Sequence, residues 1–379
     1  MTLIITNEEV EQLVTMTDCV EAMDEAQRAY GEGKAVHGPV CRVMTPRDPS
    51  VFAERGTPQA TGEAKRSIDS DYPLHYTYTS LSGAIEPLGV TCDRIDSDGI
   101  YYVEDADGIK EVRVPMCRDS QFCGLITLWD SDTAEPLAYI HDAVAQKMRV
   151  AACSAIGSKY LARADASEMA LIGTGWQAST QIQAHPVVRD LETVRVYSQT
   201  PDHRREFVEY WNDRLDLDVV ETDSIGSAVD GADIVVTATN SVTPLITREM
   251  VEHGMFLTGV KHLEFEVDVY HDADRIFANS PTHRTWERFV IGGSDVIPEE
   301  RFDDERRAIL EGDYPLLGEA AAGVVEGRRT EGEVINLINK GDGIQFAAVG
   351  HAVYRRAVEA GVGHEIPTEL FLQGKEYVP

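Results

Sequence analysis

A glycine-rich stretch between an apolar run and a helix-forming run is the clearest chemical signal in this sequence. Within EMALIGTGWQASTQIQAHP, residues 168–186, a G-x-G-x-x-A motif is formed by Gly173, Thr174, Gly175, Trp176, Gln177 and Ala178. The first glycine of such a motif permits a tight turn after a strand, the second lets a pyrophosphate approach the backbone, and the small third residue lets helix and strand pack closely. Free N–H groups at the helix N-terminus favour the phosphate charge. The sequence therefore predicts a dinucleotide-binding site here.

The end of the next predicted strand selects between the two nicotinamide dinucleotides. NAD sites commonly place Asp or Glu there to bind both ribose hydroxyls. In VRVYSQTPDHRREF, residues 194–207, that place is taken by Ser198, Gln199 and Thr200. These three residues include no carboxylate, which would repel the 2′-phosphate of NADP. The sequence therefore favours NADP, with NAD as the alternative.

Small and polar residues also follow two later predicted strands, in ADIVVTATNS and MFLTGV. Ligands of open α/β sheets bind outside the carboxyl ends of the strands. We therefore predict further cofactor contacts from Thr237, Ala238, Thr239 and Val260. The alternative for the threonines is that they only turn the chain before Pro244.

With their surroundings, these motifs make the chain resemble the ornithine cyclodeaminase/mu-crystallin family. The similarity is carried by LITLWDSDTAEPLAYIHDAVAQKMRVAACSAIGSKYLARADASEMALIGTGWQA, ADIVVTATNSVTPLI and IQFAAVGHAVYRRAVEAGVG. It implies a homodimer in which an N-terminal domain binds substrate and forms the subunit interface. A Rossmann domain follows, and hydride transfer takes place at the α-carbon of an amino or imino acid in the cleft between the domains.

The resemblance also implies two substrate-binding arginines, Arg149 in QKMRVAA and Arg42 in PVCR. A guanidinium group can bind a carboxylate through two parallel hydrogen bonds, which suits a small carboxylate substrate. The alternative for each arginine is a structural salt bridge.

The sequence departs from the family at two positions. Thr91 stands where the resemblance implies a substrate-site lysine, and Lys261 stands where it implies the catalytic aspartate. Nearby residues offer replacement chemistry, so we predict Arg94 as a substrate-binding residue and Asp98, Lys261 and His262 as catalytic residues. A lysine with a lowered pKa, or a histidine, can protonate an imine or a carbinolamine. The alternatives are a solvated strand end for Arg94 and Asp98 and a loop cation for Lys261.

The predicted elements around these residues begin with two short helices in residues 1–30. Thr6 or Asn7 is expected to cap the first, and Thr17 or Asp18 the second. Short β-rich runs broken by Gly, Pro and Asp follow and indicate an antiparallel sheet or open barrel.

The remainder of the chain has a different pattern of predicted elements. A helix at 143–163 precedes alternating strands and helices from residue 169, the pattern of a doubly wound parallel sheet. We therefore predict an α/β protein with a Rossmann NAD(P)-binding domain at 146–334. An N-terminal α+β domain for substrate binding and dimerisation would combine 1–145 with 335–379.

The overall charge limits the partners. Among 379 residues, 65 acidic against 34 basic side chains give a net charge of −31, and the mean hydropathy is −0.24. This charge would repel nucleic acids and anionic membranes, so neither is expected as a partner. Because the acids are spread along the chain, we predict a halophile's cytoplasm, where molar salt shortens the Debye length to about 3 Å. An acidic mesophilic protein is the alternative.

The cysteines and the N-terminus agree with a cytoplasmic setting. The six cysteines are scattered without metal-ligand spacing, so we expect reduced thiols and no metal site. No secretory signal is predicted at the N-terminus.

Three functions follow from these observations. The leading hypothesis is an NAD(P)-dependent oxidoreductase that reduces a small imino acid, or a 2-oxo acid plus an amine, to an amino acid, or catalyses the reverse dehydrogenation. The first alternative is a cyclodeaminase, which releases ammonia with no net redox change and needs Asp98 or Glu264 to replace the missing aspartate. The second is a non-catalytic NADP-linked binding protein.

Overall fold

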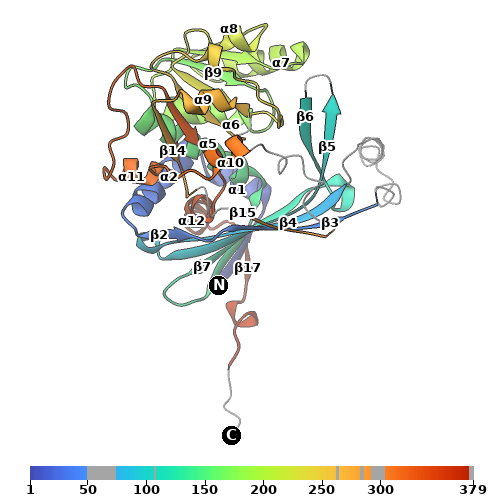
Figure 1. The fold of residues 1–379 in the computed structure, drawn as a ribbon. Coiled ribbons are helices and arrows are strands. Elements are labelled where there is room, and N and C mark those ends of the chain that lie inside the picture. The colour runs from blue at the N-terminus through green and yellow to red at the C-terminus, as the bar shows by residue number, and fades with distance from the viewer. Residues whose placement is uncertain (49–73, 106–107, 262–263, 282–285, 292–303, 375–379) are drawn as a thin grey trace.

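Two β-sheets, joined by helices, organise the chain (Figure 1). The computed structural model describes residues 1–48, 74–105, 108–261, 264–281, 286–291 and 304–374. The first sheet is built mainly from the N-terminal part of the chain and the second from its middle part.

The N-terminal sheet has ten strands in the order β15-β3-β4-β5-β7-β8-β1-β17, with β2 paired to β4 and β6 paired to β5. Its strands are β1 (Thr2–Ile5), β2 (Ala35–His37), β3 (Val40–Pro46), β4 (His75–Ile85), β5 (Val90–Asp105), β6 (Gly108–Val114), β7 (Cys123–Asp130), β8 (Pro136–His141), β15 (Trp286–Val290) and β17 (His364–Ile366). Pairing from β3 through β8 is antiparallel, which confirms the predicted antiparallel sheet.

Helices α1 (Asn7–Leu13) and α2 (Met16–Gly31) occupy the predicted N-terminal region. Thr6 caps α1 as expected, but the predicted cap of α2 was wrong, because Thr15 caps this helix. Asp18 accepts a hydrogen bond from the Thr15 backbone and completes a capping box three residues into the helix. Asp18, the third residue of the helix, was therefore mistaken for the cap because it takes part in the capping hydrogen bonds.

Two long helices join the sheets. Helix α5 (Asp142–Leu161) follows β8 and leads into the second sheet, while α12 (Gly343–Ala360) packs against β4, β5, α2 and α5. Both helices are largely buried, and one continuous hydrophobic core includes residues of both helices and both sheets. This shared core fixes the position of one sheet relative to the other.

The second sheet is parallel and has seven strands in the order β11-β10-β9-β12-β13-β16-β14, which confirms the predicted Rossmann-type sheet. Its strands are β9 (Glu168–Ile172), β10 (Thr193–Tyr197), β11 (Asp218–Glu221), β12 (Ile234–Thr237), β13 (Phe256–Gly259), β14 (Arg275–Ala278) and β16 (Ile335–Ile338). The helices of this part are α6 (Ala178–Ala184), α7 (Pro201–Asn212), α8 (Ile225–Val229), α9 (Val267–His271), α10 (Asp304–Leu310) and α11 (Leu317–Ala321).

The predicted domain boundaries assign two strands, β15 and β16, to the wrong sheet. β16 pairs with β13 and β14 in the parallel sheet, and β15 pairs with β3 in the N-terminal sheet. We therefore propose that the Rossmann unit extends through Ile338 and that the segment of β15 belongs to the N-terminal unit.

Over the described ranges, no helix has both the length and the apolar character needed to cross a bilayer. The described residues also contain no group of three or more His, Cys, Asp or Glu side chains arranged to hold a metal ion. All six cysteines are free thiols.

Candidate active site

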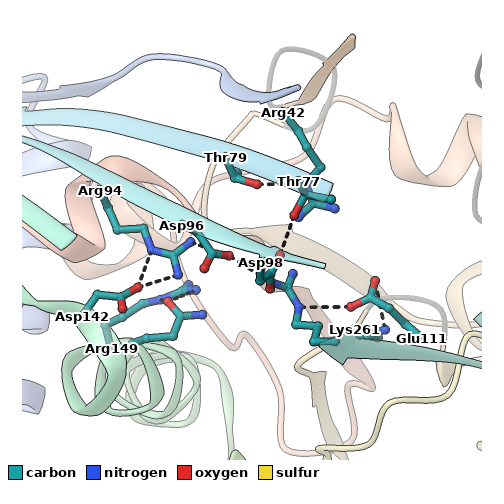
Figure 2. Close-up of polar contacts among 12 residues, drawn as sticks. Arg42, Thr77, Thr79, Arg94, Asp96, Asp98, Glu111, Asp142, Arg149 and Lys261 are labelled. Carbon is teal, nitrogen blue, oxygen red and sulfur yellow. Dashed lines mark hydrogen bonds and ion pairs between the residues drawn. The ribbon is translucent and has the colours of Figure 1, made fainter. Parts of the chain in front are cut away.

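A row of polar side chains lies on one face of the N-terminal sheet. Along β5, Arg94, Asp96 and Asp98 are spaced by two residues, so they project from the same face, and all three are buried. On neighbouring strands, Thr79 lies opposite both Asp96 and Arg42. The predicted residues Arg42, Arg94 and Asp98 are therefore brought together, because strand alternation places them on one surface (Figure 2).

Arg94 is held by carboxylates on both sides. Its Nη2 lies 2.5 Å from Oδ2 of Asp142, at the start of α5, and its Nη1 lies 3.2 Å from Oδ2 of Asp96. Burial opposes ionisation of Asp96, but Arg94 and Arg113 keep the pKa of this carboxyl below its ordinary value. The charge of Arg94 is thus balanced within the protein.

Arg149 is balanced differently. Its Nη1 donates to Oε1 of Gln345 at 2.5 Å, and its Nε and Nη2 donate to Oε1 of Gln146 at 3.1 and 2.9 Å. Burial and the neighbouring Arg94 lower the pKa of Arg149 to about 10, so the guanidinium stays charged at neutral pH. Within the described part of the chain it forms no ion pair. A buried cation held by neutral amides is suited to binding an anion.

A chain of charged contacts leads from the sheet to the Rossmann strands (Figure 2). Asp98 accepts hydrogen bonds from Thr77 at 2.5 Å and from Nη1 of Arg113 at 2.7 Å. Nε of Arg113 lies 3.3 Å from Oε1 of Glu111, whose Oε2 lies 3.6 Å from Nζ of Lys261. The structure therefore links Asp98 and Lys261, two predicted catalytic residues, through Arg113 and Glu111.

The predicted catalytic residues differ in accessibility. Asp98 is only 1% exposed, and burial raises its pKa above the ordinary value. The side chain of Lys261, just beyond β13, is 20% exposed. His262 lies outside the described residues.

The glycine loop has the features expected of a phosphate cradle. Gly173 has φ +117°, and a Cβ there would collide with the carbonyl oxygen of Ala238, so a glycine is required. A Cβ on Gly175 would meet nothing within 4 Å, so the backbone at the second glycine faces open space. Trp176 is half-exposed and Gln177 precedes α6. The loop therefore fits the pyrophosphate of a dinucleotide.

The remaining predicted cofactor residues lie at the same edge of the parallel sheet. Ala238 N donates to Ile172 O at 2.8 Å and Val260 N donates to Thr237 O at 2.9 Å, so pairing continues just beyond the ends of β12 and β13. Ser198, Gln199 and Thr200 directly follow β10. Strand order places the glycine loop after β9, between these two groups.

Glu264, considered in the sequence only as a replacement for the missing aspartate of a cyclodeaminase, organises part of this edge. It is fully buried, and its carboxylate accepts hydrogen bonds from the Thr237 hydroxyl, the Thr239 hydroxyl, the Thr239 backbone and the Lys261 backbone. Burial raises its pKa to about 7 despite these donors. The hydroxyls of Thr237 and Thr239 therefore donate to Glu264, and their contact with a cofactor stays a prediction.

Other supporting residues were also missed by sequence reasoning. Asp342 caps α12 and accepts a hydrogen bond from the Gln345 backbone at 3.1 Å, and the Phe346 ring lies against Arg149. The Asp-Gly-Ile-Gln sequence before an apolar helix is a capping signal that could have located the start of α12. No spacing in the sequence links Gln345 to Arg149, which lies 196 residues away.

The parallel sheet defines a Rossmann-type fold, and the relatives described next are dehydrogenases and reductases, so the protein is an NAD(P)-dependent oxidoreductase. A profile of the ornithine cyclodeaminase/mu-crystallin family matches residues 117–361, and the chain belongs to this family. An alanine dehydrogenase of Archaeoglobus fulgidus is 27% identical over 377 residues, covering 96% of this chain and 98% of that protein. A Δ1-pyrroline-2-carboxylate reductase of Bacillus cereus is 28% identical over 248 residues, covering 64% of this chain and 74% of the relative.

Solved structures share the fold. The Thermococcus litoralis Δ1-pyrroline-2-carboxylate reductase in complex with NADH and L-proline has a TM-score of 0.71 and 22% identity, covering 96% of this chain and all (100%) of that one. An archaeal alanine dehydrogenase dimer with bound NAD has a TM-score of 0.70 and 23% identity, covering 97% of this chain and 99% of that one.

Proposed function

We propose that this protein reduces a small imino acid, or a 2-oxo acid plus an amine, to an amino acid, or catalyses the reverse dehydrogenation. The observation that carries this proposal is Arg149, a buried cation held by two neutral glutamines beside the polar face of the N-terminal sheet. Asp342 and Asp142 act on Arg149 from a distance, and a substrate carboxylate would supply the direct ion pair that Arg149 does not form among the described residues.

The proposed mechanism assigns a distinct task to each group of residues. Arg149 binds the carboxylate. Arg42 and Arg94 lie on the adjoining sheet face, where Asp142 and Asp96 already balance the charge of Arg94. A nicotinamide cofactor at the Gly173–Ala178 loop supplies hydride to the α-carbon or accepts it from there. Holding the α-carbon at a fixed place relative to the loop accounts for much of the rate of such a step.

Proton transfer is proposed for Lys261, whose ammonium group is positioned by Glu111. In the reductive direction Nζ donates a proton to the imine nitrogen or the carbinolamine oxygen of the substrate. Asp98 is enclosed by Thr77 and Arg113, so we propose that it acts by positioning Arg113.

NADP is proposed as the preferred cofactor. Ser198, Gln199 and Thr200 follow β10 and carry no carboxylate that would repel a 2′-phosphate. Two of the solved relatives are described with NADH or NAD bound, so cofactor preference has to be measured on this chain itself.

A homodimer is proposed from the outer face of the N-terminal sheet. Phe289, Val43 and Tyr78 lie side by side on β15, β3 and β4, and they are 56%, 43% and 38% exposed. An apolar row across three adjacent strands is typical of a face covered by another subunit. With the net charge of −31, we further propose a halophilic and cytoplasmic setting.

The deciding experiment follows NADPH and NADH oxidation by the purified protein in concentrated KCl. Pyruvate, glyoxylate, oxaloacetate and cyclic imino acids are each supplied with and without ammonia or methylamine. Oxidation with one of these substrates supports the proposal, and dependence on the amine distinguishes imine formation on the enzyme from reduction of a preformed imine. Ammonia release from a diamino acid without net oxidation would instead establish a cyclodeaminase. Cofactor binding with neither reaction would point to a binding protein.

A further inference from the structure

The β5–β6 hairpin of the N-terminal sheet reaches the carboxyl edge of the parallel sheet. Three hydrogen bonds join them: the Glu111 backbone donates to Asn240 O at 3.1 Å, the Val242 backbone donates to Ile109 O at 2.9 Å, and the Ile109 backbone donates to Thr243 Oγ1 at 3.0 Å. These contacts use the backbone of β6, so the hairpin is fixed against the loop that follows β12. Side chains of β6 are thereby held at the predicted cofactor edge.

Lys110 occupies the centre of this contact. Its backbone bridges Ser241, four residues beyond β12, and its Nζ donates to Oε1 of Gln199 at 3.3 Å. Gln199 follows β10, and β9 lies between β10 and β12 in the sheet. Lys110 therefore extends from the end of β12 to the end of β10, across the strand that carries the glycine loop.

The position of the ammonium group has a specific chemical meaning. In a Rossmann sheet, the residues directly after the second strand contact the adenosine ribose, and Ser198, Gln199 and Thr200 occupy that place. An ammonium beside a neutral amide can bind a phosphate oxygen as a point charge. Lysine is also uncommon in this sequence: only eight of the 34 basic residues are lysines.

Arg204, the first arginine after this place in the sequence, has other partners. Its Nε donates to Oε1 of Glu221 at 3.0 Å, and its Nη1 donates to the carbonyl oxygen of Ser198 at 2.5 Å. Arg204 thus ties the end of β10 to the end of β11. The Arg204 guanidinium is therefore already bound to a carboxylate of the protein.

We propose that Nζ of Lys110 binds the 2′-phosphate of NADPH and thereby determines cofactor specificity. The N-terminal sheet would then supply part of the dinucleotide site, and the cofactor would connect the two sheets. This proposal rests on the proposed preference for NADP and adds a named residue to it.

Binding titrations test the assignment without relying on activity. Dissociation constants for NADPH and NADH are measured by nicotinamide fluorescence for the wild type, Lys110→Met and Lys34→Met. Lys34 pairs with the exposed Glu32 and serves as the matched control. Loss of one charged hydrogen bond is expected to weaken NADPH binding by Lys110→Met about 10- to 100-fold, with NADH binding and the control unchanged. Competition by 2′,5′-ADP should weaken in parallel, whereas competition by 5′-ADP should not.

The other outcomes overturn separate statements. A wild type that binds NADH more tightly than NADPH refutes the NADP preference, and the role of Lys110 fails with it. A wild type that prefers NADPH, with Lys110→Met unchanged, refutes Lys110 alone. Equal losses for both cofactors would refute specificity and place the ammonium at the pyrophosphate. Because Lys110 uses only backbone atoms in its bridge to Ser241, an unchanged melting temperature is expected for the variant.

Discussion

Arg94 and Arg149 contact the same aromatic ring, but their charges are balanced in different ways. Their Cζ atoms lie 5.2 and 4.7 Å from the centroid of the Phe346 ring. Arg94 is paired with Asp142, whereas the hydrogen bonds of Arg149 go to neutral glutamines. Among the described residues Arg149 therefore has hydrogen bonds but no ion pair, and the carboxylate of a substrate would form that pair.

Replacing Arg149 tests this reading directly. Arg149→Ala is expected to lower kcat/KM for the carboxylate substrate by about 100-fold or more, because a buried charged pair can no longer form. The loss should appear mainly in KM, while the dissociation constant for the nicotinamide cofactor stays unchanged. Steady-state kinetics and fluorescence titration measure the two quantities.

The matched control is Arg214→Ala, since Arg214 packs on Tyr210 away from the polar face. If Arg149→Ala keeps wild-type kinetics, Arg149 does not bind the substrate carboxylate.

A substitution at Gly175 can test cofactor binding without disturbing the fold. Its α-carbon faces open space, so Gly175→Asp should fold normally yet repel the phosphates of the cofactor. Nicotinamide fluorescence titration is expected to show at least a 100-fold loss of affinity, about 3 kcal/mol. Gly332→Asp, at another glycine with open space around it, should bind cofactor normally. Unchanged binding by Gly175→Asp would refute the loop assignment.

The outline of the fold could be predicted because local patterns determine it. The alternation of strands and helices from residue 169 indicated the parallel sheet, and the first glycine of the motif has the positive φ that such a turn requires. The sheet to which β15 belongs could not be predicted, since a short strand that pairs with one edge of a distant sheet has no local sequence pattern. Domain boundaries therefore depend on pairing that the sequence does not display.

The site was predictable only in part for a related reason. Arg94 and Asp98 were identified because they follow Thr91, which stands at the position of the family's substrate-site lysine, and could replace the missing charge. Arg113 and Glu111 lie on the paired strand β6, and Gln345 comes from α12, so their contacts arise from tertiary packing. Likewise, Glu264 was weighed only as a replacement base, whereas its burial makes it a structural anchor.

The apolar row on the N-terminal sheet predicts the effect of a surface charge. Tyr78→Lys should shift the protein from dimer to monomer, because a buried unpaired ammonium destabilises an interface by several kcal/mol. Sedimentation velocity at several concentrations measures the change. Val358→Lys replaces an exposed apolar residue on α12 and should leave the assembly unaltered. A wild type that is monomeric throughout would refute the proposed interface.

The net charge predicts a dependence of stability on salt. Raising KCl from about 0.1 to 2 M should increase the melting temperature, because counter-ions screen repulsion among the acidic groups. Differential scanning fluorimetry provides the measurement. A melting temperature independent of KCl would favour an acidic mesophilic protein.

Glu264 predicts how stability changes with pH. Its pKa is about 7 in the folded protein, against 4.5 for an unperturbed glutamate, and burial is the main cause. Between these values the folded state retains a proton that the unfolded state has lost, so the free energy of unfolding should fall as pH rises through this window. The contribution is on the order of 3 kcal/mol and should level off above about pH 7.

The variant Glu264→Gln should remove this dependence, because the amide does not titrate. Urea unfolding at intervals from pH 4.5 to 8 compares its slope with that of the wild type, and the difference isolates Glu264 from other titrating groups. Glu326→Gln, at an exposed position, should retain the wild-type slope. If both variants follow the wild type, Glu264 stays ionised throughout, and its four donors outweigh the cost of burying its charge.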